Sequence, residues 1–163
     1  MKRVAIITSS DSGFAGERED LSGAVIKEIC EEEGFEVVSR IVLPDEQKLL
    51  SNEMKRICDE GLADLILTTG GTGLSPRDCM PEATMAIIER NVPGIPEAMR
   101  AHGMTITKRS MLSRAVAGVR KSTLIINLPG SPKAVRENLE FIITELNHAL
   151  EILLGEAHNC ARK

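Results

Sequence analysis

The stretch LILTTGGTGLSPRDCMPEAT, residues 65–84, contains the three parts of a β-loop-α unit in order. Its apolar beginning, together with Asp64, predicts a strand over residues 64–69. Three glycines within four positions follow, and then a proline opens a run typical of the first turn of a helix. A strand that passes through a loop into a helix is the repeating unit of parallel sheets, because parallel neighbours need a crossover connection.

Similar units lie on both sides of this stretch. Apolar runs predict further strands over residues 4–8, 36–43 and 123–128. Helical spacing predicts helices over residues 21–33, about 46–59 and about 81–90, and a long last helix after residue 132. Prolines and glycines interrupt residues 91–122, where we expect one short helix near 96–101 and assign no structure to the rest. The pattern predicts an α/β fold with three layers, a mostly parallel sheet between helices, as a single domain over residues 1–163.

The composition argues against several classes of protein. The chain has 163 residues, 20 basic and 24 acidic, and no basic block, so a nucleic-acid partner is not expected. Three Phe and no Trp or Tyr leave little on which bases could stack. The four cysteines form no CxxC pair and the three histidines no HExxH pair, so we expect no structural zinc, with Cys30 and Cys58 in the core. No membrane span or signal peptide is indicated, and a cytoplasmic location is expected.

Four loops are predicted to meet at one edge of this sheet. In open α/β sheets, ligands bind outside the carboxyl ends of the strands. The polar or glycine-rich segments that follow the predicted strands are residues 9–20, 44–47, 70–78 and 129–132. All four fall at that edge, so the sequence predicts one cleft lined by these loops.

The glycine loop has the chemistry of an anion cradle. Glycine allows positive φ and close approach, so successive N–H groups can point into one concavity. The residues that would form it are Gly70, Gly71, Thr72, Gly73, Ser75 and Arg77. The alternative is a tight connection between strand and helix. Standard phosphate motifs do not fit, because GxxxxGK[ST] is absent and Pro76 stands where GxGxxG needs its last glycine.

Two aspartates follow strand ends, Asp45 in LPDEQ and Asp78 in SPRD. Beside an anion cradle such a pair suggests Mg²⁺ held by one or two carboxylates and by substrate phosphate oxygens. The reaction class would then be phosphoryl or nucleotidyl transfer. The alternative for each aspartate is a solvated or helix-capping residue.

Downstream of these motifs lies the stretch MLSRAVAGVRKSTLIINLPGSPKAV. Together they resemble the MogA/MoaB family of molybdenum-cofactor biosynthesis and the matching domain of gephyrin and its plant counterpart. The resemblance runs from ITSSDSGFAGEREDLSG to the last helix. It implies a three-layer α/β fold that binds molybdopterin and, in the MogA-like branch, transfers AMP from ATP to its terminal phosphate with Mg²⁺. It also implies a homotrimer, with a hexamer as the alternative assembly, and transient contact with a molybdate insertase. The alternative is a MoaB-type protein that binds or scaffolds with little turnover.

The same resemblance suggests roles for particular residues. It implies metal binding and catalysis for Asp45 and Asp78, and polar contacts on the pterin side for Ser113 and Asn127. Other ligand contacts are implied for the glycine loop, for the first loop and for the last loop: Gly70, Gly71, Thr72, Gly73, Ser75; Asp11, Asp20, Ser22, Gly23; Pro129, Gly130, Ser131. The plain alternatives are that Ser22 and Gly23 begin a helix and that Asn127 satisfies a strand end.

The chain departs from the family pattern at two places. Cys79 and Met80 stand where the family usually has Val and Thr, and Gly103 stands where a serine is common. The lost threonine could have capped the helix that begins near Pro81. Asp78 is then a candidate cap, which would compete with metal binding.

Overall fold

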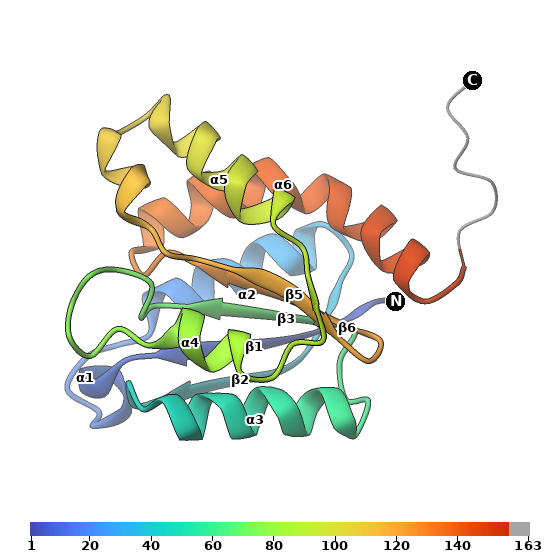
Figure 1. Cartoon of the computed structure of the whole chain (residues 1–163), viewed down its shortest axis with the longest axis horizontal. Coiled ribbons are helices and arrows are strands. Elements are labelled where there is room, and N and C mark those ends of the chain that lie inside the picture. Colours follow the sequence, from blue (N-terminus) through green and yellow to red (C-terminus); the bar gives the residue numbers. More distant parts are fainter. Residues whose placement is uncertain (157–163) are drawn as a thin grey trace.

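The computed structural model describes residues 1–156, and within them it has a single six-stranded sheet between two layers of helices (Figure 1). The order across the sheet is β2-β1-β3-β6-β5-β4. The first four strands of this order run parallel, and β5 and β4 run antiparallel to their neighbours. The strands are β1 (Arg3–Ser9), β2 (Glu36–Leu43), β3 (Leu65–Thr69), β4 (Arg90–Asn91), β5 (Ala117–Arg120) and β6 (Thr123–Leu128).

The helices cover both faces of the sheet, as the sequence predicts. In Figure 1, α2, α5 and α6 lie on one face, and α3 and α4 lie on the other. The helices are α1 (Asp11–Phe14), α2 (Leu21–Glu32), α3 (Gln47–Asp59), α4 (Met80–Met85), α5 (Gly94–Met104) and α6 (Pro132–Leu153), with a 3-10 helix η1 (Lys108–Leu112). The predicted three-layer α/β fold is therefore confirmed.

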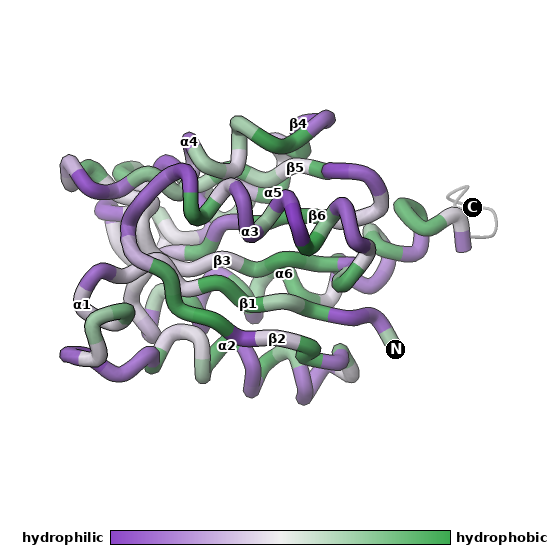
Figure 2. Tube along the Cα trace, turned by 90° about the horizontal axis from the view of Figure 1, so that it is seen from below, coloured by the Kyte–Doolittle hydropathy of each residue, from purple (hydrophilic) through white to green (hydrophobic). Residues whose placement is uncertain are grey.

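The alternation of side chains along the central strands separates the core into two layers. Val4 and Ile6 of β1 pack on the side of α2 and α6, whereas Ala5 and Ile7 pack on the side of α3 and α4. All five residues of β3 are buried. Figure 2 shows this hydrophobic character along β1, β3 and β6. Strands that are apolar on both faces are typical of a parallel sheet covered on both sides.

Two predictions for the middle of the chain were wrong in their extent. The helix expected over residues 81–90 ends at Met85, because the chain then turns and the N–H of Glu89 donates to the carbonyl of Val119. Residues 90–91 pair with β5 instead of continuing the helix. The helix expected near 96–101 is α5, which is longer and begins at Gly94, with Pro96 in its first turn, where proline is tolerated.

The two ends of the described chain lie at the edge of the sheet opposite the predicted cleft. Strand β1 begins at that edge, and α6 runs back to it from the loop after β6 (Figure 1). Lys2 and Glu156 form an ion pair there. Among residues 1–156, none of the helices has the length and apolar character needed to cross a membrane.

Candidate functional site

The loops at the carboxyl ends of the parallel strands meet, as the sequence predicts. The N–H of Ser10 donates to the carbonyl of Leu43 at 2.9 Å, which joins the loops after β1 and β2. The hydroxyl of Thr69, at the end of β3, donates to the carbonyl of Pro129 at 2.5 Å. The hydroxyl of Ser22 donates to the carbonyl of Gly130 at 2.6 Å. These contacts bring the first, third and last loops around one depression.

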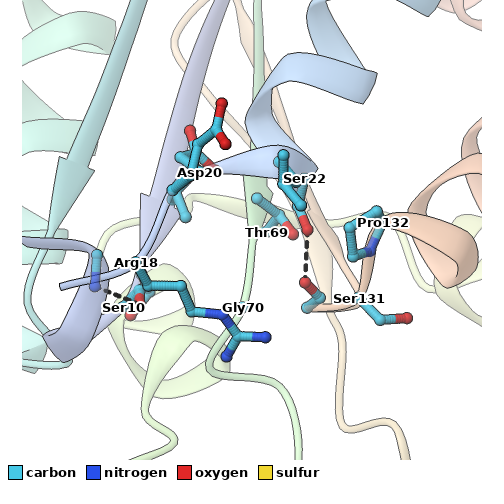
Figure 3. A pocket seen from close by; sticks show the side chains of 14 residues that line it. Ser10, Arg18, Asp20, Ser22, Thr69, Gly70, Ser131 and Pro132 are labelled. Atoms are coloured by element: carbon cyan, nitrogen blue, oxygen red, sulfur yellow. Dashed lines mark hydrogen bonds between the residues drawn. The ribbon is translucent and has the colours of Figure 1, made fainter. Parts of the chain in front are cut away.

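That depression is a cleft of about 450 Å³ between the first loop, the end of β3 and the start of α6 (Figure 3). The predicted site residues that line it are Asp20, Ser22, Gly70, Gly130 and Ser131. Arg18 also lines it, and its side chain extends away from the first loop over the cleft. The sequence prediction missed Arg18, although its position in a loop after a parallel strand was the available signal.

The carboxylate of Asp20 is held by hydrogen bonds within the protein and fixes the end of the first loop. Its carboxylate accepts hydrogen bonds from the N–H of Gly23 at 2.9 Å and from the hydroxyl of Thr8 at 3.0 Å, and it pairs with Arg40. A Cβ at Gly23 would lie 2.2 Å from this carboxylate. Asp20 is thus the N-cap of α2, and the alternative in which Ser22 and Gly23 begin a helix fits the structure.

Gly70 and Gly71 have the backbone conformation that the cradle prediction requires. Their φ values are +86° and +69°, in the region that favours glycine. A Cβ at Gly70 would lie 2.4 Å from the carbonyl oxygen of Ser9. On its other side, Gly130 approaches so closely that its own Cβ would lie 3.5 Å from the Cα of Gly70. Bare backbone from three loops therefore forms the floor of the cleft.

The second half of the glycine loop is fastened to Arg114, another residue that the sequence prediction missed. The carbonyl of Thr72 accepts from the N–H of Arg114 at 2.9 Å, and the carbonyl of Gly73 accepts from its Nε at 2.8 Å. The guanidinium also donates to the carbonyl of Asp78 at 3.0 Å. Thr72 is buried, and the positive φ does not extend to Gly73. Of the glycine loop, only Gly70 lines the cleft. Gly71 also has positive φ, but a Cβ there would lie 3.3 Å from the Cβ of Met80 and from the hydroxyl oxygen of Ser9.

Asp45 lies in a polar cluster beside the cleft. Its carboxylate accepts from the hydroxyl of Ser9 at 2.5 Å and from the N–H of Asp11 at 3.1 Å. Arg77, predicted to hold an anion, instead makes two hydrogen bonds of 2.9 Å to the carboxylate of Asp11. The hydrogen bond from Arg77, with that from the N–H of Asp45, lowers the pKa of Asp11. In this structure Arg77 is engaged with the protein.

Asp78 lies close to the same cluster and does not cap α4. Its carboxylate accepts from the N–H of Ser75 at 3.1 Å, and the N-cap of α4 is Cys79, whose side chain makes no capping hydrogen bond. The alternative in which Asp78 caps this helix therefore does not fit the structure. Burial raises the pKa of Cys79, and the charges of Asp45, Glu82 and Asp78 raise it further. The charges that act on the Cys79 thiol therefore include those of Asp45 and Asp78.

The carboxylates of Asp45 and Asp78 are the donors that could hold a magnesium ion. Within residues 1–156, no group of three His, Cys, Asp or Glu side chains forms a complete protein metal site. Mg²⁺ is usually bound through one or two carboxylates, with waters and substrate phosphates as the remaining ligands. Two hard oxygen donors beside a cleft fit that pattern.

A second recess of about 160 Å³ contains Ser113 and Pro129. It lies between α5, η1 and the start of α6, and Met99 and Arg100 also line it. Pro129 faces this recess while the next residue, Gly130, lines the larger cleft, so one peptide unit joins the two spaces.

Gly103, one of the departures from the family pattern, has a steric reason in this recess. A Cβ at Gly103 would lie 2.2 Å from the hydroxyl oxygen of Ser110. A serine at position 103 would collide with Ser110, which already presents a hydroxyl in the same place. The position therefore suits glycine as long as Ser110 keeps this conformation.

The structure does not bring Asn127 to a surface where a ligand could contact it. Asn127 is fully buried, and its Nδ2 donates to the hydroxyls of Thr68 and Thr84, each at 3.0 Å. Its Oδ1 accepts from the N–H of Val116 at 3.2 Å. These contacts fit the alternative role, in which Asn127 satisfies polar groups at a strand end.

Comparisons with known proteins agree with this fold. The model of a family described as "Probable molybdopterin binding domain" matches residues 5–148. A molybdopterin adenylyltransferase of Helicobacter pylori (strain ATCC 700392 / 26695) is 39% identical over 93% of this chain and 88% of its own length. The molybdopterin adenylyltransferase of Escherichia coli K12 is 37% identical, over 85% and 72%. A crystal structure of the molybdopterin biosynthesis enzyme MoaB from Thermus thermophilus has a TM-score of 0.90 and 48% identity, over 95% of this chain and 98% of that one.

Proposed function

The chain belongs to the family of probable molybdopterin binding domains, and from that premise we propose that it is a molybdopterin adenylyltransferase of molybdenum-cofactor biosynthesis. In this reaction the terminal phosphate of molybdopterin attacks the α-phosphate of ATP. The new phosphorus–oxygen bond gives adenylyl-molybdopterin, and pyrophosphate leaves. Relatives similar over most of this chain carry the name of this activity.

The observation that carries the proposal is the bare backbone at the floor of the cleft. Gly70 has positive φ and lines the cleft without a side chain, so its peptide group is open to a ligand there. Polyphosphate chains need such close backbone approach. Arg18 adds a positive charge over the cleft, and α6, a helix of 22 residues, begins beside it. The N-terminus of a helix favours anions.

The reaction must bring two polyanions together, and the polar cluster beside the cleft offers the groups to do so. In the proposal, Asp45 and Asp78 hold Mg²⁺, which supplies positive charge where the phosphates meet. Ser9 and the N–H of Asp11 fix both oxygens of Asp45. Asp78 is held through one oxygen by Ser75. These hydrogen bonds restrict the orientation of both carboxylates.

The smaller recess beside Ser113 is the proposed seat of the pterin. Flat heteroaromatic ligands need apolar walls with a few placed polar groups, and this recess combines Pro96, Met99 and Ala115 with Ser113 and Arg100. Because Pro129 and Gly130 are consecutive, a ligand seated there could extend its phosphate toward the larger cleft.

The assembly proposed for this chain is a homotrimer, which can double into a hexamer. Near the end of α5 and in η1 the protein exposes several large apolar side chains: Met104, Ile106, Met111 and Leu112. Such a group is a candidate for a subunit contact. Light scattering that gave a monomer at micromolar concentration would contradict the trimer. A cytoplasmic location and transient contact with a molybdate insertase remain predictions.

One assay tests the activity. Purified protein is incubated with molybdopterin, ATP and Mg²⁺, and pyrophosphate release is measured. The proposal expects release that depends on molybdopterin. Tight molybdopterin binding without release would favour the MoaB-type binding protein, and release without molybdopterin would favour a nucleotide hydrolase.

A further inference from the structure

Polar contacts centred on Asp11 tie three loops together at the ligand edge. The N–H of Asp45 donates to the carboxylate of Asp11 at 2.9 Å, and the N–H of Asp11 donates back to the carboxylate of Asp45 at 3.1 Å. Arg77, 66 residues further along the chain, donates two hydrogen bonds of 2.9 Å to the carboxylate of Asp11. The loops after β1, β2 and β3 therefore meet at one side chain.

These contacts contribute little to the stability of the fold. The side chains of Asp11 and Arg77 are 45% and 56% exposed, and exposed ion pairs are usually worth little. Helix α1, which begins with Asp11, places no side chain in the core. What the contacts do achieve is orientation, since the N–H of Asp11 holds one oxygen of Asp45 while Ser9 holds the other.

The charges explain why an arginine completes the arrangement. Asp11 and Asp45 each accept a hydrogen bond from the other's N–H, which brings two acidic residues into one cluster, and like charges repel. The guanidinium of Arg77 offsets that repulsion.

We propose that Asp11 and Arg77 are positioning residues, which set the direction of the Asp45 carboxylate and do not themselves contact the substrates. The inference rests on the proposed function, in which Asp45 acts at the nucleotide. The sequence suggested instead that Asp11 and Arg77 contact the ligand directly. Arg77 is then the counter-charge of Asp11 and not a phosphate ligand.

Steady-state kinetics of Asp11→Ala and Arg77→Met test the inference. Each variant should lose about tenfold or more in kcat, because small misplacements of a catalytic group can cost up to about 100-fold, while KM for ATP stays within about twofold. The double variant should lose no more than either single one, because both act through Asp45. Arg77→Lys should recover only part of the rate, since an ammonium cannot match the two-pronged contact.

Asp59→Ala is the matched control. Asp59 also pairs with one arginine through two hydrogen bonds, of 2.8 and 3.1 Å to Arg120, but it ends α3 at the opposite edge of the sheet. The kcat of Asp59→Ala should equal that of the wild type. If Asp11→Ala fails to fold by circular dichroism, Asp11→Asn takes its place, because it keeps an acceptor for the N–H of Asp45.

Two results would overturn the inference. The first is a rise in KM for ATP of about tenfold or more in Arg77→Met, together with a lower KM for ATP in Asp11→Ala. That pair of results would mean that Arg77 binds a phosphate of ATP and that Asp11 holds it back from doing so. The second is structural and needs no activity, namely crystal structures of the variants in which the Asp45 carboxylate keeps its wild-type direction. If the wild type released no pyrophosphate, the proposed function would fail, and these crystal structures would still decide whether Asp11 positions Asp45.

Discussion

Replacing Gly70 by alanine tests the close approach of backbone at the floor of the cleft. The added methyl group would lie 2.4 Å from the carbonyl oxygen of Ser9 and 3.4 Å from its carbonyl carbon. These are backbone atoms of β1, so no side-chain rotation can relieve the contact. A non-glycine residue with positive φ costs about 1 to 2 kcal/mol, and overpacking costs about 1 to 3 kcal/mol. The expected loss in the free energy of unfolding is therefore about 3 kcal/mol.

Gly34→Ala separates the two contributions. Gly34 has φ +82°, close to the +86° of Gly70, but no heavy atom lies within 4 Å of its added Cβ. It should lose only the backbone part, about 1 kcal/mol. The effect of alanine on the unfolded chain is common to both variants and cancels in the comparison.

Urea unfolding followed by far-ultraviolet circular dichroism gives both values, because the chain has no Trp or Tyr for fluorescence. All proteins are measured at one concentration, since assembly would shift the apparent stability. Equal losses in Gly70→Ala and Gly34→Ala, within about 0.5 kcal/mol, would refute the argument that the approach of Ser9 requires glycine at position 70.

Three further variants test the carboxylates and the buried thiols. Asp78→Asn should lower pyrophosphate release on the order of 100-fold with an almost unchanged melting temperature, because Asp78 does not cap α4; a wild-type rate would end its catalytic assignment. Gly73→Ala places a Cβ 2.9 Å from the Asp78 carboxylate, so displacement of that carboxylate should slow the reaction about tenfold, and an unchanged rate would show that its position is not critical. Burial raises the pKa of Cys30 from 9.0 to about 12, so this thiol ionises at a lower pH in the unfolded chain than in the folded one. The free energy of unfolding should therefore fall above pH 9, by up to about 1.4 kcal/mol per pH unit. Cys30→Ala should show a shallower decline, and an identical slope would contradict this origin.

Most of the long elements could be predicted from the sequence, whereas the short β5, which buries Ala117 and Val119, and the elements without buried side chains could not. Strands β2 and β6 have the predicted bounds, and β6 is buried along its whole length, whereas β2 at the side of the sheet alternates exposed and partly buried residues. Helices α1 and η1 bury no side chain, so they leave no apolar periodicity to detect. Strand β4 has only two residues, and its existence depends on pairing with β5.

The candidate site shows the same division. The meeting of the four loops follows from the rule for parallel strands and needs no side-chain detail. The engagement of Arg77 by Asp11 depends on where two loops 66 residues apart come to lie. The inward direction of Asn127 depends on hydroxyl groups supplied by Thr68 of β3 and Thr84 of α4. Such partners are chosen by tertiary packing, and no local pattern in the sequence reports them.

The ion pair of Lys2 and Glu156, at the edge opposite the cleft, has a consequence for how this unit can be combined with others. Both ends of the described chain therefore lie on the side of the molecule away from the cleft. A linker there could vary in length and composition without obstructing entry to the cleft. A second catalytic module could therefore be fused at either end, and the linker would then set the effective concentration at which that module meets the released product.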